Sequence, residues 1–437
     1  MNKEVNCLIL ENYTRKNICW WIVLLFFLQI ILTTNSFLVL CFFFSTLLTI
    51  KYIKFLKYYL PKGILLYILW AIIPLIIGLL NGNEYRDIIR TMSYFFNGVM
   101  ALLFGTVLVL KFKNYDLWKT ILFIQVLFTF WCFIIAVPQL GSGYNDLRQA
   151  LSVDIASLEF IFPVFVLDKI SDNRNYFNKK IDVFIIILFL VRILLCLSRT
   201  TIIGALVGCL IYYYFLDNRK KNVKLFKRVV FITFFILFAV YTILTLVPDN
   251  VIEPFVSKFS NIFSEMSTKE TFASYSDALA NWRGYENNAA IIQWNNYDLF
   301  SKLFGNGFGG LIKMKYISSL WSGMNFYDKG AIPFLHIGFF TILCIEGIIG
   351  LIIFIRIFVK NIIYAIRVRK YYGIYNETAK YIMLFVLMIL NTYVTRGLFA
   401  SEMYLSWGII IGVCNYEIKL KMNKLKNQNL NLNHQRV

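Results

Sequence analysis

Apolar runs alternate with shorter polar segments along almost the whole chain. A helix needs about 20 consecutive apolar residues to cross the hydrocarbon core of a bilayer, and most of the runs come close to that length. The pattern therefore predicts an all-α polytopic membrane protein with about twelve transmembrane helices. The runs lie at residues 18–34, 36–50, 63–80, 91–110, 119–138, 154–168, 181–197, 200–216, 228–247, 333–355, 379–396 and 402–418.

The composition of the chain requires an apolar solvent. Hydrophobic residues make up 59% of the 437 positions and charged residues only 16%, whereas soluble domains hold about 45–50% and about 25%. This excess excludes a soluble domain, a coiled coil, a collagen, a disordered tail and a secreted disulfide scaffold. The 8 cysteines have neither metal-ligand nor disulfide spacing, so we expect them to pack as small apolar residues.

The positive charges predict how the helices are oriented. The 44 lysines and arginines give a net charge of +20, and they gather in every second polar segment rather than in one stripe suited to nucleic acid. Because cytoplasmic loops are enriched in these residues, both termini are expected in the cytoplasm. The first run lacks a small-residue cleavage site, so it should stay as an anchor. The enriched segments are 3–16, 51–62, 111–119, 169–180, 219–228, 356–380 and 419–436.

One polar segment is much longer than the others. Residues 248–332 separate the ninth and tenth runs, on the predicted outer side of the membrane. Apolar residues recur there at helical spacing over 251–262 and 278–292, which predicts helices lying against the outer face of the bundle. The resulting division of the chain is spans one to nine in 1–247, the external loop in 248–332, spans ten to twelve in 333–418, and a polar cytoplasmic tail in 419–437.

The external loop contains a glycine-rich stretch, Gly305-Asn306-Gly307-Phe308-Gly309-Gly310. It matches the dinucleotide-binding pattern G-x-G-x-x-G, but no βαβ unit surrounds it. We therefore expect a glycine turn that brings the backbone close to a membrane surface or a ligand, and no nucleotide site.

Arginines stand out among the charges of the predicted outer face. Topology depletes positive charge there, and guanidinium groups bind phosphate oxygens in pairs and stay charged, so we expect an anionic partner such as a pyrophosphate. Arg192 and Arg199 flank the turn between the seventh and eighth spans, where charge is costly unless paired or hydrated. The alternative for Arg199 is an interfacial side chain that snorkels, and for Arg192 an ion pair with Glu159 or Asp154. The other outer arginines beyond the long loop are Arg86, Arg90, Arg148 and Arg396.

His336 is the candidate for acid–base chemistry. It lies at the predicted outer start of the tenth span, where a neutral imidazole is suited to accept a proton from a sugar hydroxyl. The alternative is a histidine with its hydrogen bonds satisfied in the core. Glu346 lies about 15 Å deeper by helical rise, too far away to orient His336, and either has a function of its own or pairs with a neighbouring span.

Three motifs, taken in order, resemble those of a known family. Ser198-Arg199-Thr200-Thr201 opens a span rich in small residues, Trp282-Arg283 lies in the long loop, and His336 is followed by Gly347-Ile348-Ile349-Gly350. Their order and spacing are similar to the motifs of the O-antigen ligase and O-antigen polymerase superfamily of bacterial membrane glycosyltransferases. Ile337 stands where the ligase pattern carries a polar residue, which favours the polymerase branch.

The resemblance implies an enzyme that polymerises oligosaccharide repeat units carried on undecaprenyl pyrophosphate, for O-antigen, capsule or exopolysaccharide. The active site would face the periplasm or exterior from the bacterial inner membrane, with no nucleotide sugar, metal or cofactor. The resemblance assigns Arg199 and Arg283 to the pyrophosphate and His336 to general base catalysis, with Arg192 and Arg396 as further binding candidates. For Arg283 the alternative is a headgroup anchor. The expected partners are the lipid-linked glycan, the bilayer and a chain-length regulator protein.

Two other functions stay open as alternatives. A ligase would use the same donor but transfer the finished glycan to another acceptor. A flippase or secondary transporter for lipid-linked sugars would also use arginine for pyrophosphate, but it should place ionisable groups near the midplane of several spans and seldom needs so long an external loop. The concentration of arginine at the outer face favours external chemistry.

Overall fold

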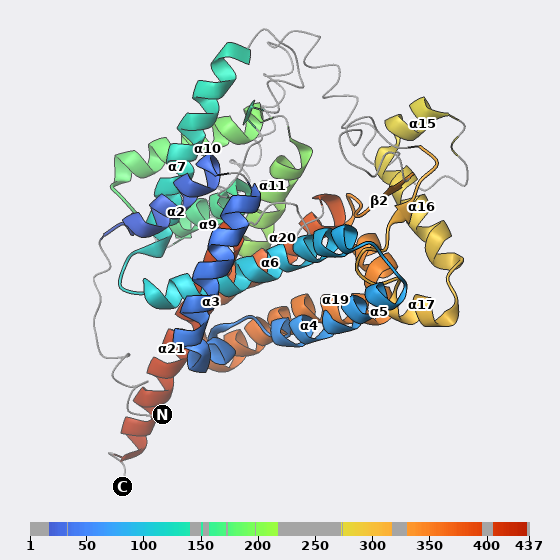
Figure 1. Cartoon of the computed structure of the whole chain (residues 1–437). Coiled ribbons are helices and arrows are strands. Elements are labelled where there is room, and N and C mark those ends of the chain that lie inside the picture. The colour runs from blue at the N-terminus through green and yellow to red at the C-terminus, as the bar shows by residue number, and fades with distance from the viewer. Residues whose placement is uncertain are drawn as a thin grey trace.

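The computed structural model describes most of the chain as helix (Figure 1). The described residues are 17–32, 34–139, 150–151, 157–171, 174–196, 198–216, 272, 274–316, 330–395 and 405–434. The long helices are α2 (Trp20–Ile31), α3 (Thr34–Tyr59), α6 (Tyr85–Lys111), α7 (Leu117–Ala136), α9 (Leu158–Ser171), α10 (Lys179–Leu195), α11 (Arg199–Tyr214), α16 (Trp282–Asn295), α19 (Gly338–Tyr372), α20 (Asn376–Thr395) and α21 (Leu405–His434). Shorter elements are α4 (Ile64–Trp70), α5 (Ile72–Leu80), the 3-10 turn η1 (Val137–Gln139), α15 (Tyr275–Ala280), α17 (Leu299–Phe304), and the strands β1 (Ile312–Lys313) and β2 (Ala331–Ile332).

Four of the described helices are long and apolar enough to cross a membrane. They span Tyr85–Lys111, Leu117–Gln139, Gly338–Tyr372 and Asn376–Val394. Large apolar side chains point outward from the bundle, among them Leu80, which is 81% exposed, as expected of a surface that faces lipid. Described helices overlap every predicted run except 228–247, which lies outside the described residues, and the number of crossings stays a prediction.

Local sequence signals set several helix boundaries. The side chain of Asp116 accepts a hydrogen bond from the backbone N–H of Lys119 and starts α7, and Asn178 does the same for Ile181 at the start of α10. At its far end, α19 stops at Gly373, which has the left-handed conformation (φ 64°) typical of a helix C-cap.

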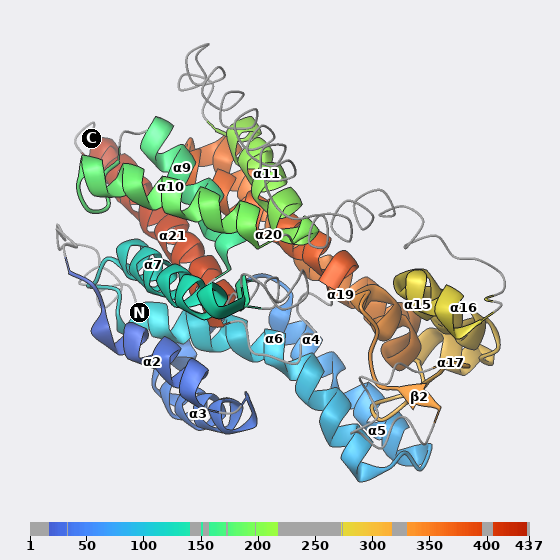
Figure 2. The ribbon, with the colours of Figure 1, turned by 90° about the horizontal axis from the view of Figure 1, so that it is seen from above.

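Small residues let two of the long helices cross at backbone contact. A side chain at Gly408 of α21 would meet the carbonyl oxygen of Ala101 in α6 at 1.7 Å, and one at Gly105 would meet the backbone of Gly408. Close crossings of this kind increase van der Waals contact between membrane helices. The helices α7, α9, α10 and α11 gather at one end of the structure, and α15 to α17 with β2 at the other (Figures 1 and 2).

A buried ion pair joins α9 of the first group to α20. Lys380 Nζ donates to Asp168 Oδ2 at 2.6 Å, and both side chains are almost fully buried. The hydroxyl groups of Tyr176 and Tyr212 donate to the same carboxylate, each at 2.6 Å. The carboxylate therefore has partners on the loop before α10, on α11 and on α20, and fixes these elements to one another.

The glycine-rich stretch inserts beside a break in α19. Gly347 interrupts the helix with φ 68° and ψ −172°, and the N–H groups of Asn306 and Gly307 donate to the carbonyls of Cys344 and Ile345, each at 3.0 Å. On the other side of the stretch, a side chain at Gly307 would lie 2.2 Å from the backbone nitrogen of Gly78 in α5. The backbone of the glycine-rich stretch therefore lies in close contact with α5 and α19, where the sequence had predicted contact with a membrane surface or a ligand.

Candidate functional site

The site forms where α16 packs against the start of α19. A small apolar cluster, separate from the main core, joins α16, the two strands and the chain entering α19. A helix over 278–292 was predicted, and α15 and α16 confirm helical structure there. The buried members of the cluster are Phe272, Ala278, Tyr285, Ala290, Ile312, Met314, Ile332, Leu335 and Cys344.

The carboxylate of Glu286 holds both the ring and the backbone of His336. Its two oxygens lie 2.9 and 3.0 Å from His336 Nδ1, and Oε2 accepts the backbone N–H of His336 at 2.7 Å. One helical turn earlier, Trp282 Nε1 donates to Glu286 Oε1 at 2.6 Å. Because residues i and i+4 of a helix share a face, α16 itself aims the indole and the carboxylate at one histidine.

These partners determine the tautomer of His336. The indole and backbone N–H groups can only donate, so Glu286 acts as an acceptor toward both and is an acceptor for the imidazole as well. In the neutral imidazole, Nδ1 then carries the proton and Nε2 has the lone pair. Glu286 is 1% exposed, whereas His336 is 35% exposed, so the ring is held from within the protein and is open on its other side.

The segment that carries His336 is fixed before and after it. The backbone N–H of Leu335 donates to Thr341 Oγ1 at 2.9 Å, and the ring of Phe334 lies 4.0 Å from that of Tyr94 in α6, centroid to centroid. Ile337, at the N-cap of α19, is buried. His336 thus precedes the helix rather than belonging to it, and its position is set by three separate elements.

Two of the four candidate arginines lie at helix starts. Arg283 is the second residue of α16, next to Trp282, and is half-buried. Arg199 is the first residue of α11 and is half-buried. Since α11 packs mainly against α9 and α20, and lies apart from α16 in both views (Figures 1 and 2), Arg199 belongs to a different group of helices.

Arg192 is placed differently from both. Arg192 is fully buried in α10, and its Nη1 donates to Thr129 Oγ1 of α7 at 3.2 Å. Of its predicted alternative partners, Asp154 lies outside the described residues, and Glu159 is half-buried on α9. Arg396 lies outside the described residues as well.

Glu346 lies away from His336, next to the break in α19. It is fully buried, and its Oε1 accepts a hydrogen bond from the hydroxyl of Tyr67 in α4 at 3.1 Å. Of the two roles predicted for this residue, the structure shows the pairing with a neighbouring helix. The carboxylate that orients His336 therefore comes from α16.

Glu286 is the residue that the sequence analysis missed. Glu286 follows Trp282 by four residues, so it lies on the same helical face that the sequence predicts from Ala278, Trp282 and Ala289. A carboxylate on an otherwise apolar face is costly unless it has partners, and this was the available signal. What the sequence lacked was the partner, which lies 50 residues away at the start of α19.

Within the described ranges, no group of three or more His, Cys, Asp and Glu side chains is arranged to hold a metal ion. The cysteines described there are free and buried. No protein-family model matches the chain, and a search of curated proteins finds no match either.

Proposed function

We propose that the protein is a membrane glycosyltransferase that polymerises oligosaccharide repeat units carried on undecaprenyl pyrophosphate, at the outer face of the bacterial inner membrane. The observation that carries this proposal is the pairing of His336 with the buried carboxylate of Glu286. A histidine that is oriented by a carboxylate and has 35% of its side chain exposed is suited to general base catalysis. The resemblance of the motifs around Arg199, Trp282 and His336 supplies the substrate class.

In the proposed reaction, an acceptor sugar hydroxyl attacks the anomeric carbon of the donor glycan. The new glycosidic bond forms as the bond from that carbon to the pyrophosphate oxygen breaks. The hydroxyl proton passes to His336 Nε2, and the electron pair of the broken bond leaves with the lipid pyrophosphate. Glu286 keeps Nε2 in its accepting tautomer and stabilises the imidazolium that forms, before His336 releases the proton to water.

The arginines would stabilise the leaving group. A lipid pyrophosphate gains negative charge as the bond breaks, and guanidinium groups in a partly desolvated site stabilise such charge. Arg283 is the best placed, since it shares α16 with Glu286, and Arg199 is the second candidate. Because Arg199 lies in another group of helices, it would reach the same pyrophosphate only if α11 moved toward α16 when the lipid-linked donor binds.

The experiment that tests the proposal removes the imidazole. The gene is deleted in its native host and replaced by wild type, His336→Ala or His434→Ala, and the surface glycan is separated by size. We expect wild type and His434→Ala to give a ladder, and His336→Ala to give single capped repeats although the protein is inserted normally. Long polymer in the His336→Ala strain would sink the proposed role.

The same deletion separates the alternatives. Single capped repeats indicate a polymerase, and long polymer retained on the lipid carrier indicates a ligase. Repeats that accumulate on the cytoplasmic side, without any capped product, indicate a flippase or transporter.

The arginine roles are tested by variants that keep the charge. Arg283→Lys and Arg199→Lys retain a cation but lose the planar fork that binds phosphate oxygens in pairs. We expect shorter ladders from both, and no change from Arg356→Lys, which alters an exposed arginine in the cytoplasmic part of the predicted topology. Full activity in both test variants would favour interfacial anchoring over pyrophosphate binding.

A further inference from the structure

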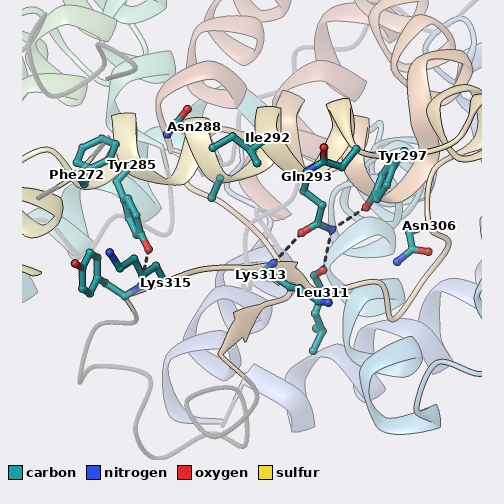
Figure 3. Close-up of a pocket in the computed structure, with 13 residues that line it drawn as sticks. Phe272, Tyr285, Asn288, Ile292, Gln293, Tyr297, Asn306, Leu311, Lys313 and Lys315 are labelled. Carbon is teal, nitrogen blue, oxygen red and sulfur yellow. Dashed lines mark hydrogen bonds between the residues drawn. The ribbon is translucent and has the colours of Figure 1, made fainter. Parts of the chain in front are cut away.

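A second feature of α16 has no role in the site at His336. A cavity of about 620 Å³ lies between another face of α16 and the chain segment that contains β1 (Figure 3). This volume falls in the range of small-molecule sites, about 300–1,000 Å³. Aromatic, amide and lysine side chains line much of it, including Tyr285, Asn288, Gln293, Asn296, Lys313 and Tyr316.

The walls of the cavity are fixed by hydrogen bonds between its own lining residues. Gln293 Nε2 donates to the carbonyl of Leu311 at 3.1 Å and to the hydroxyl of Tyr297 at 2.8 Å, and its Oε1 accepts the backbone N–H of Lys313 at 2.8 Å (Figure 3). At the other end, Tyr285 accepts the backbone N–H of Tyr316 at 2.6 Å. The cavity is therefore preformed, which lowers the entropy cost of binding.

Other lining groups are available to a ligand. Across the described part of the chain, the side-chain amides of Asn288 and Asn296 and the ammonium of Lys313 have no hydrogen-bonding partner. An amide offers both donors and an acceptor, which matches a hydroxyl that donates and accepts. Burial raises the pKa of Tyr297 to about 12, so its phenol is neutral at any working pH.

The lining chemistry favours one class of ligand. Phe272, Tyr285, Tyr297 and Tyr316 give the cavity an aromatic wall suited to apolar C–H surfaces, and the amides provide pairs for hydroxyl groups. Among the described residues that line the cavity there is no carboxylate, so a cation would meet no anionic ligand from them. Saccharides combine C–H faces with dense hydroxyl groups, and Lys313 and Lys315 add attraction for acidic substituents.

We propose that this cavity binds a sugar segment of the glycan substrate, away from the reacting bond. The inference rests on the proposed function for the identity of the glycan, while the site itself follows from the cavity. One face of α16 would then hold His336 through Glu286, and another would hold the saccharide. A glycan bound along this helix is positioned relative to His336 by a single rigid element.

The test uses the full chain in lipid nanodiscs and fluorescently labelled oligosaccharides of one to three repeat units, cut from the surface polysaccharide of the host. We expect wild type to bind them, and Asn288→Ala/Asn296→Ala to bind about tenfold more weakly, as the loss of one or two hydrogen bonds predicts. Asn295→Ala is the matched control, since it lies on the same helix and is exposed but does not line the cavity. His336→Ala should bind as wild type does.

The outcomes separate this inference from the proposed function. Unchanged binding in the double variant, no binding by wild type, or tighter binding of uridine diphosphate would each overturn the saccharide site. Should the double variant fail to fold, Asn296→Ala alone, at an exposed position, serves the same purpose. Normal polymer in the His336→Ala strain, together with weaker binding in the double variant, would reject the catalytic proposal and leave the saccharide site standing.

Discussion

Two buried carboxylates in this molecule have opposite surroundings. Asp168 is held by hydrogen bonds from Lys380, Tyr176 and Tyr212, all of them buried, and a more distant arginine, Arg174, lies 4.0 Å from it. Glu286 is equally buried, but the imidazole it holds is 35% exposed and has one nitrogen left over. The first arrangement, Asp168 with Lys380, Tyr176 and Tyr212, is the closed cluster, and it ties helices together. The second, Glu286 with Trp282 and His336, is the open cluster. The second ends in a group that can still react, which is what separates a structural cluster from a candidate site.

The largest effect is expected at the closed cluster. Asp168→Ala removes the carboxylate that pairs with the buried ammonium of Lys380 at 2.6 Å, and breaking a buried pair in this way costs about 3–5 kcal/mol. We expect little folded protein in the membrane, measured as the amount inserted and its thermal midpoint. The double variant Asp168→Leu/Lys380→Met removes both charges and should recover most of the loss. A single variant as stable as wild type would contradict the structural role.

At the open cluster, the loss should appear in activity and leave the fold intact. Glu286→Gln keeps the shape but no longer enforces the Nδ1–H tautomer, and comparable changes in catalytic triads are severe. We expect kcat to fall about 10²-fold or more with the KM for the lipid-linked donor and the thermal midpoint little changed. Glu346→Gln, at a buried carboxylate bound by Tyr67, is the control and should keep its activity. Equal losses in both variants would remove the distinction between them.

The support of the open cluster should be sensitive to the break in α19. In Gly347→Ala the new methyl group would lie 2.3 Å from the carbonyl oxygen of Leu303, and residue 347 would have to keep a φ of 68°. We therefore expect the free energy of unfolding to fall by about 1–3 kcal/mol. Gly373→Ala imposes a similar φ (64°) with nothing closer than 3.7 Å and should cost less. Thermal midpoints of the two variants make the comparison, and a smaller loss at Gly347 would contradict the close approach.

The smallest effects sharpen the contrast. Trp282→Phe removes one donor to Glu286, and Tyr212→Phe removes one donor to Asp168. A single hydrogen bond contributes about 0.5–1.5 kcal/mol, so the change in activity or in thermal midpoint should be modest for each variant. We expect Trp282→Phe to lower activity with little change in stability, and Tyr212→Phe to do the reverse. The opposite assignment would mean that the open cluster is structural.

Much of the helical architecture could be predicted from the chain alone. The apolar runs at 91–110 and 119–138 coincide with α6 and α7 because long apolar helices leave few other choices for the backbone. The helix around Trp282 followed from its spacing in the same way. His336 was identified from its rarity and position, and the structure places it in a polar cluster at the edge of the bundle.

The partners of these residues could not be predicted, because they depend on contacts between distant segments. Glu286 meets His336 only after the long segment folds back onto α19, and the glycine-rich stretch finds its acceptors only at the break created by Gly347. Periodicity assigns a residue to a face of its helix. It carries no information about which helix covers that face.

The most direct test of the central claim is a double-mutant cycle between Glu286 and His336, measured as transfer from the lipid-linked donor by the protein in nanodiscs. If the two residues act as one unit, Glu286→Gln/His336→Ala should be no less active than His336→Ala alone. Losses that multiply, or full activity in His336→Ala, would contradict the account.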